Sequence, residues 1–338
     1  MMNEAHALLL SREAATQDQS PLFSKLPGEV RGLIFAFALS DYPDPNKQFD
    51  PMTCYARPSY FAPRKTDIEL LRTCRAVYRE CWHMPFALRE QVHWATEIDR
   101  APPGFWSQDS RLAERLSHIT ELQGETEIDS LRIFAQMYKL EQGDVAALLR
   151  TPFLHPRSVT LTIRHADWWF WESDTPLYFE GSWIQSFCEA MSSSVCEIHL
   201  ELESLQRKKR QVDDIAKQMA ERWCFKRRDG AVLYADTHKE AFKVSQWSGT
   251  STWHNRRWIR DETEPDRIDY YIVTVSFRLE SIQNRRGATV SEGARETARR
   301  GYSNTERLKL RVPWATRIAS AAPSIYVGTT DLIVRPVD

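Results

Sequence analysis

Glycine is scarce in this chain, at 12 of 338 residues, and the motifs that depend on it are missing. Neither GxxxxGK[ST] nor GxGxxG occurs, which removes both glycine-rich nucleotide fingerprints. No HExxH motif, no Cys/His pair at zinc-finger spacing and no G-x-S-x-G elbow occur either. The common signatures of nucleotide, zinc and acyl-transfer sites are therefore absent, and we expect neither a cofactor nor a metal.

Cysteine, net charge and long apolar runs are also limited. The six cysteines form no CxxC pair, which favours a reduced intracellular chain over a disulfide framework. A net charge of −1 gives no bias toward nucleic acid or acidic membranes. No apolar run approaches the roughly 18 residues of a membrane helix, and residues 7–10 are too short for a signal-peptide core. We expect an intracellular protein, cytoplasmic and/or nuclear, with no membrane and no nucleic-acid partner.

The most informative segment spans residues 21–42. Its apolar residues recur at helical spacing, namely Leu26, Val30, Leu33, Ile34 and Phe37. Pro27 suits a first helical turn, where its missing N–H has no intrahelical partner. A second stripe with helical spacing follows at residues 68–81, after a stretch with five prolines at residues 41–66. We therefore expect two helices joined by a proline-rich loop.

These two segments resemble the F-box-like family, in the form common in fungal proteins. The first reads Leu-Pro-Gly-Glu-Val-Arg at residues 26–31 and Ile-Phe-Ala-Phe-Ala-Leu at residues 34–39; the second is residues 70–80. The resemblance implies that the helices dock on the small Skp-type adaptor of a cullin ubiquitin ligase, while the remaining domain captures a substrate protein. The adaptor-binding positions that it implies are Leu26, Pro27, Val30, Ile34 and Phe37.

The middle of the chain alternates between strand and helix patterns. We expect strand-then-helix units at residues 118–122 and 131–140, at 158–164 and 183–191, and at 195–202 and 205–223. Further strands are expected at residues 231–235, 242–247 and 268–277. The predicted fold class is a mixed α+β or α/β chain. Its F-box-like helices would pack on an open, degenerate leucine-rich-like sheet with a β-rich C-terminal portion.

Composition divides the chain into five parts. We expect a disordered N-terminus at residues 1–19, an F-box-like helical region at 20–100, an α/β to β-rich interaction domain at 101–280, a flexible basic segment at 281–311, and a C-terminal tail at 312–338 with a docked strand. The basic segment holds eight Lys/Arg and three Asp/Glu, with few large apolar residues.

Two aromatic loops are the second candidate for binding. The first follows a predicted strand and contains Trp168, Trp169 and Trp171; the second contains Trp253, Arg257 and Trp258. Tryptophan is enriched at binding hot spots, so one interpretation is a composite surface for a protein partner. The alternative is a satellite core that caps the end of the sheet, together with Trp183.

Other chemistry-bearing groups have competing explanations. His165, Asp167 and His199 suggest a metal, but we favour satisfied structural imidazoles. Cys188, Cys196 and His199 suggest a nucleophile, but we favour buried cysteines that act as small hydrophobes. Nine Lys/Arg against three Asp/Glu in residues 206–228 form either a patch for phosphate or an acidic partner, or a solvated helix face.

Three classes of function stay open at this stage. The favoured one is a monomeric, non-enzymatic subunit of a ubiquitin ligase, and the second is a stand-alone scaffold without a ligase link. The third is an enzyme in which Asp167, Asp174, His165 or His199 converge. Exposure of the apolar helix face at residues 26–37 discriminates the first from the second, because a fully covered face cannot dock.

Overall fold

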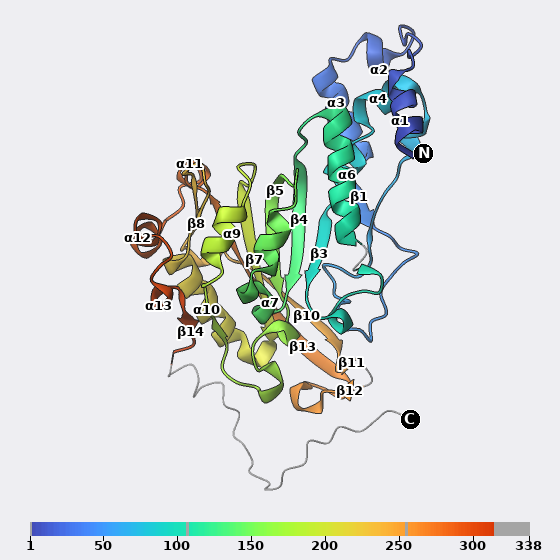
Figure 1. Cartoon of the computed structure of the whole chain (residues 1–338). Helices are drawn as coiled ribbons and strands as arrows, with labels where there is room; N and C mark the ends of the chain where they lie inside the picture. Colours follow the sequence, from blue (N-terminus) through green and yellow to red (C-terminus); the bar gives the residue numbers. More distant parts are fainter. Residues whose placement is uncertain (1, 106–107, 254–255, 314–338) are drawn as a thin grey trace.

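A mixed β-sheet runs through the centre of the protein (Figure 1). The computed structural model describes residues 2–105, 108–253 and 256–313. The strand order is β3-β4-β5-β7-β13-β9-β8, with β10 also paired to β13. The parallel half consists of β3 (Gln91–Ala95), β4 (Ile128–Ala135), β5 (Pro156–Ile163) and β7 (Glu197–Leu205). The mixed α/β class predicted from the sequence is therefore confirmed.

The C-terminal half of the sheet is antiparallel and centres on one long strand. This strand, β13 (Arg267–Leu279), pairs with β7 along one edge. Along its other edge it pairs with β10 (Lys243–Thr250) and then with β9 (Val232–Ala235), which in turn pairs with β8 (Phe225–Lys226). The β-rich portion predicted from the alternating sequence pattern is present here.

Alternation along the strands gives the sheet two unlike faces. On β5 and β7 the apolar positions are fully buried, namely Val159, Leu161, Ile163, Ile198, Leu200 and Leu202. The intervening positions are polar, namely Thr160, Thr162, His199, Glu201 and Glu203. Because successive side chains point to opposite faces, these strands place an apolar row on one face and a polar row on the other.

Helices cover the apolar face. They are α7 (Met137–Gln142), α8 (Asp144–Leu149), α9 (Ile184–Ala190) and α10 (Lys209–Arg222). The α10 helix buries Val212, Ile215, Ala216 and Met219, a stripe at the helical spacing that the sequence predicts. Gly143 joins α7 to α8 with a φ of +93°, a conformation that glycine adopts without a steric penalty.

One predicted strand-then-helix unit is wrong. Residues 118–122 belong to helix α6 (Gln108–Gln123), and the segment predicted as a helix at residues 131–140 begins with strand β4. In β4 both faces are covered, since Leu131 and Ile133 join the main core and Phe134 packs on the opposite side. A strand buried on both faces reads as a continuous apolar run, which periodicity alone does not separate from a helix.

The N-terminal region is a small helical group beside one end of the sheet (Figure 1). It contains α1 (Met2–Ser11), α2 (Pro21–Ser24), α3 (Gly28–Ala38), the 3-10 helix η1 (Glu69–Arg72), α4 (Arg75–Cys81) and α5 (Met84–Ala87). The structure therefore has a helix within residues 1–19, where the sequence predicts disorder. Phe35 of α3 and Leu39, the residue that follows the helix, pack against Val77 and Cys81 of α4.

The proline-rich loop returns to its starting point. Its two ends form a short antiparallel pair, β1 (Asp41–Pro43) with β2 (Arg64–Thr66). Arg64 donates two hydrogen bonds to the Asp41 carboxylate, at 2.6 and 2.8 Å. This closure brings α4 back beside α3 despite the intervening residues. Within the loop, Phe49, Tyr55 and Tyr60 pack on Trp94 and Phe134 of the sheet.

The predicted flexible basic segment is folded in the structure. It forms α11 (Glu280–Arg285), α12 (Glu292–Arg300), α13 (Thr305–Leu308) and β14 (Leu310–Arg311), which pairs with β6 (Tyr178–Phe179). Ala294 and Leu308 are buried, and Arg299 and Arg300 both pair with Glu296. Leu308 and Leu310 join the main core, so a few buried side chains anchor a segment that has few large apolar residues. The strand expected within the 312–338 tail lies outside the described residues.

Short elements complete the described chain. The remaining strands are β11 (Thr252–Trp253) and β12 (Arg256–Arg257), and the remaining 3-10 helices are η2 (Ile98–Arg100), η4 (His165–Asp167), η5 (Trp171–Ser173), η6 (Gln206–Lys208), η7 (Lys239–Ala241) and η8 (Ile259–Asp261). Among the residues that the structure describes, no helix has the length and apolar character needed to cross a membrane.

Candidate functional site

Helix α3 exposes an apolar stripe. Phe37 is 83% exposed, Leu33 62%, Ile34 41% and Val30 39%. These positions follow the i, i+3, i+4, i+7 spacing of one helix face. Of the other predicted adaptor-binding residues, Pro27 is exposed and Leu26 is half-buried. The face that the sequence marks as apolar is thus mostly open to solvent, while Phe35 and Leu39 hold the helix to its neighbours.

Polar contacts fix the orientation of α3. Arg31 forms a two-pronged ion pair with Glu80 of α4, at 2.9 and 2.8 Å, and donates a third hydrogen bond to the Leu26 carbonyl at 2.7 Å. The guanidinium also lies over the Phe23 ring. A planar guanidinium that binds a carboxylate through two donors restricts both distance and angle. The apolar stripe is therefore presented on a helix held by both packing and hydrogen bonds.

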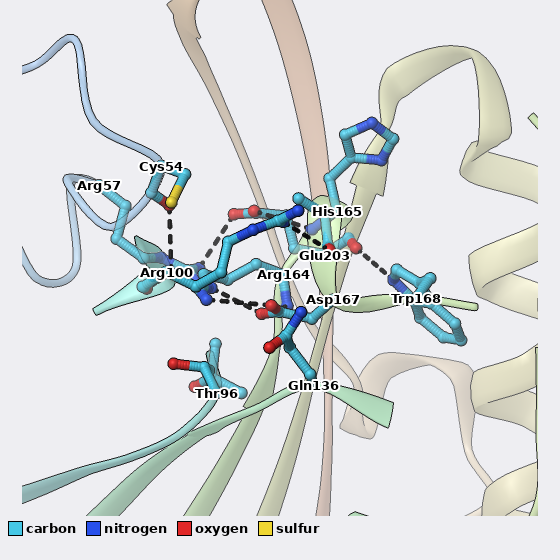
Figure 2. A network of polar contacts seen from close by, with 12 residues as sticks. Cys54, Arg57, Thr96, Arg100, Gln136, Arg164, His165, Asp167, Trp168 and Glu203 are labelled. Atoms are coloured by element: carbon cyan, nitrogen blue, oxygen red, sulfur yellow. Dashed lines mark hydrogen bonds and ion pairs between the residues drawn. The ribbon is translucent and has the colours of Figure 1, made fainter. Parts of the chain in front are cut away.

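A buried polar network lies at the carboxyl ends of the parallel strands (Figure 2). Arg57, from the proline-rich loop, reaches Glu201 at 2.9 Å and Glu203 at 3.2 Å, and only 2% of its side chain is exposed. Burial alone would raise the pKa of Glu201, but the positive charges of Arg57 and Arg132 outweigh burial and hold that pKa below its usual value. The loop is thus tied to the polar face of the sheet by a charge cluster.

The second half of this network surrounds Arg164. Its guanidinium donates to both oxygens of Asp167, at 2.6 and 3.0 Å, and to the carbonyls of Cys54 and Arg100 (Figure 2). Next to it lies a cavity of about 40 Å3, lined in part by Arg164, His165 and Glu203. Because a water needs about 10–15 Å3, this space admits waters but no organic substrate. The network therefore connects the proline-rich loop and the segment after β3 to the end of β5, which is a structural role.

The two aromatic loops meet, but most of their tryptophans face inward. Trp171 lies 4.5 Å from Trp258 and 6.3 Å from Trp253 between ring centroids. Trp168, Trp171 and Trp253 are buried, whereas Trp169 and Trp258 are half-buried and Arg257 is exposed. Arg257 is engaged by Glu262 at 2.6 Å. The partner-binding role of these loops stays a prediction, and the geometry matches the alternative of a core that caps the sheet.

Two of the remaining chemical candidates belong to one charged cluster, because Arg207 bridges Asp174 and Asp261 and His165 lies 3.7 Å from Asp261. The other candidates contact different groups. His165 approaches Asp261, His199 contacts Ser276 and Glu197, and Asp174 pairs with Arg207 and Lys208. Asp167 is occupied by Arg164. Burial raises the pKa of the Cys188 thiol to about 11, which disfavours the nucleophilic thiolate at neutral pH. Within the described ranges, no group of three or more His, Cys, Asp or Glu side chains has metal-binding geometry.

The basic stretch at residues 206–228 is partly built into the fold. Arg207 bridges Asp174 and Asp261, at 2.7 and 2.8 Å. Lys208 is buried and donates to the Thr175 carbonyl. Burial lowers the pKa of Lys208, although Asp174 acts in the opposite direction. Two of the four consecutive basic residues at 207–210 therefore hold the loop that follows β5.

Sequence reasoning missed Arg57, Glu201 and Glu203. The two glutamates alternate with leucines in a predicted strand, so a polar face of the sheet was detectable from their spacing. Arg57 sits in a proline-rich loop without any periodic pattern, and nothing local distinguishes it from an exposed arginine. Comparison with known proteins finds no matching family model, no similar curated protein and no similar solved structure.

Proposed function

We propose that this chain is a non-enzymatic protein-interaction module of the F-box-like type. Its α3 helix docks on the Skp-type adaptor of a cullin ubiquitin ligase, and the sheet domain holds a second protein. The observation that carries the proposal is the exposed stripe of Val30, Leu33, Ile34 and Phe37. Under this proposal, the four successive parallel strands with helical connections are interpreted as a degenerate leucine-rich-like platform.

The stripe has the properties of a helix that binds in a groove. Partners of such helices contact apolar anchors at i, i+3, i+4 and i+7, which is the spacing found here. Fully burying one large apolar side chain stabilises by roughly 1.5–3 kcal/mol, so leaving four of them in water is unfavourable for the isolated protein. Contiguous exposed apolar surface of this kind marks interaction sites. The opposite face of α3 is already occupied by α4, which leaves this stripe for a partner.

The enzyme alternative requires convergence of acidic and imidazole side chains. His165 and Asp174 both contact the Asp261–Arg207 pair, but the candidate carboxylates there are already held by cations. Asp167 and Asp174 pair with different cations, and His165 and His199 contact different groups. The stand-alone scaffold differs from the ligase subunit only in which protein binds the exposed stripe of α3. The experiment below separates these two.

The test is binding of the purified full chain to its host's Skp-type adaptor, measured by pull-down and then by titration. Val30→Asp/Ile34→Asp and Phe37→Asp place charge in the stripe, and Phe37 contributes least to the protein's own fold because it is the most exposed. Loss of an anchor that costs at least 2 kcal/mol weakens binding roughly 30-fold or more.

The matched control is Val244→Asp, because Val244 is a half-exposed apolar residue on β10, far from α3 (Figure 1). We expect this variant to bind like the wild type. Circular dichroism would check that each variant is folded. A folded wild type that does not bind the adaptor, or that binds equally after both α3 changes, rules out the ligase role and leaves the scaffold.

A further inference from the structure

A cleft lined by basic side chains lies between the helical group and the edge of the sheet. Its inner part has a volume of about 240 Å3 and is lined in part by Arg89, Arg111 and Arg115, together with Tyr60, Phe86 and Leu112. Arg64 and Glu90 also line it, each paired with a side chain of opposite charge. The outer part, of about 790 Å3, shares Arg89, Arg115 and Phe86 with the inner part and adds an apolar wall that includes Trp82 and Ile119. The two parts therefore form one continuous cleft.

The three arginines come from two elements. Arg111 and Arg115 are four residues apart on α6, which puts them on the same face of that helix. Arg89 lies just before β3, on the chain that follows α5. All three side chains line the same inner part of the cleft, two from α6 and one from the segment before β3.

None of the three guanidiniums has a hydrogen bond or ion pair with the residues that the structure describes. The nearby acids are occupied elsewhere: Glu90 pairs with Arg132 at 2.9 Å, and Asp41 pairs with Arg64 at 2.6 Å. Burial lowers the pKa of Arg89, and the charge of Arg115 lowers it further. Like charges facing one another in a half-enclosed cleft are unfavourable until an anion enters.

We propose that Arg89, Arg111 and Arg115 form a binding site for a phosphate monoester. Three cations without acidic partners favour a dianion over a single carboxylate, and the guanidinium fork matches the spacing of phosphate oxygens. The organic part of the ester would lie against the apolar wall at Phe86 and Trp82. This site is separate from the α3 stripe, so it stands or falls independently of the adaptor proposal.

The test is equilibrium dialysis of the full chain against radiolabelled inorganic phosphate in a buffer without other oxyanions. We expect saturable binding that weakens with added NaCl, because exposed charge interactions are screened. Arg111→Gln and Arg115→Gln should each weaken binding roughly tenfold or more, the contribution of a hydrogen bond to a charged group. Both side chains are exposed, so these variants keep the fold.

The matched control is Arg150→Gln, because Arg150 is an exposed arginine at the end of α8 that does not line the cleft. Phosphate binding should be unchanged in this variant. Competition with phenyl phosphate and with a phosphoserine peptide, each against its unphosphorylated form, then distinguishes a small organic phosphate from a phosphorylated protein segment. No saturable binding by the wild type, or equal binding by all three variants, overturns the proposal.

Discussion

Replacing Arg57 with alanine leaves two carboxylates without their shared cation on β7, the buried Glu203 and the half-buried Glu201. Glu201 keeps Arg132 at 3.6 Å and the Thr162 hydroxyl at 3.3 Å. Among the described residues, Glu203 keeps hydrogen bonds from the Trp247 indole N–H at 2.9 Å and the backbone N–H of His165 at 3.4 Å. Removing one partner of a buried ion pair costs about 3–5 kcal/mol, because it strands a charge in a poorly solvated place. Since these contacts remain, we expect Arg57→Ala to destabilise by about 3 kcal/mol.

Urea unfolding followed by tryptophan fluorescence measures this change. The tryptophans packed around the network report on it, and a shift of the midpoint at constant slope gives the loss of stability. Arg150→Ala serves as the control and should stay within about 0.5 kcal/mol of the wild type, as surface substitutions usually do. Adding Glu203→Gln to Arg57→Ala removes one stranded charge, so the double variant should lose less than the two single losses added together.

The pH dependence has a definite sign. The pKa of Glu201 is held below its usual value in the folded protein, so its ionised form stabilises the fold. That contribution is fully present above the ordinary glutamate pKa of about 4.3 and is lost as the pH falls through the lower folded value. Arg57→Ala should shrink this acid-dependent loss. A destabilisation below 1 kcal/mol, with an unchanged acid profile, would refute the reasoning that Arg57 neutralises these carboxylates.

Two further predictions concern packing and thiol chemistry. An added Cβ at Gly293 would lie 2.5 Å from the Glu221 carbonyl oxygen, so Gly293→Ala should destabilise the protein by about 1–3 kcal/mol in urea unfolding. An added Cβ at Gly32 meets nothing within 4 Å, so Gly32→Ala should stabilise α3 by about 0.5–1 kcal/mol. Equal effects of the two substitutions would contradict this packing argument. Burial raises the pKa of the Cys188 thiol to about 11 and that of the Cys224 thiol to about 12. In native protein at pH 8, iodoacetamide should therefore modify both far more slowly than the half-buried Cys196, as followed by peptide mass spectrometry. Modification of Cys188 or Cys224 as fast as that of Cys196 would contradict this prediction.

The α3 helix shows where sequence reasoning succeeds and where it stops. Spacing identified the helix and its apolar stripe, but the segment has a second apolar pair, Phe35 in α3 and Leu39 just after it, also four residues apart. Which of the two sets is buried depends on the position of α4, and that position depends on the closure of the proline-rich loop by β1 and β2. The pattern therefore predicts a helix, while the exposed face follows only from tertiary structure.

The sheet gives a similar lesson. The strands β5, β7, β9, β10 and β13 follow from alternation or from short apolar runs bounded by turn residues. Strand β4 was missed because it is covered on both faces. The described C-terminal helices were missed because only a few apolar residues, such as Leu308, anchor them and no helical stripe results. Arg57 could not be found because its partners lie more than 140 positions further along the chain.

The long strand β13 also sets the order in which this protein can form during synthesis. The outer edge of β7 pairs only with β13 among the described strands, and β13 is completed at Leu279. At 5–20 residues per second, that edge stays without its partner for roughly 4 to 15 s after β7 has been made. An open edge invites pairing with other chains, and inward-pointing charges discourage it. Glu201 and Glu203 pair with Arg57 in the folded protein. Before β13 is synthesised, the same two charges lie on the strand with the open edge, where they oppose pairing with another chain.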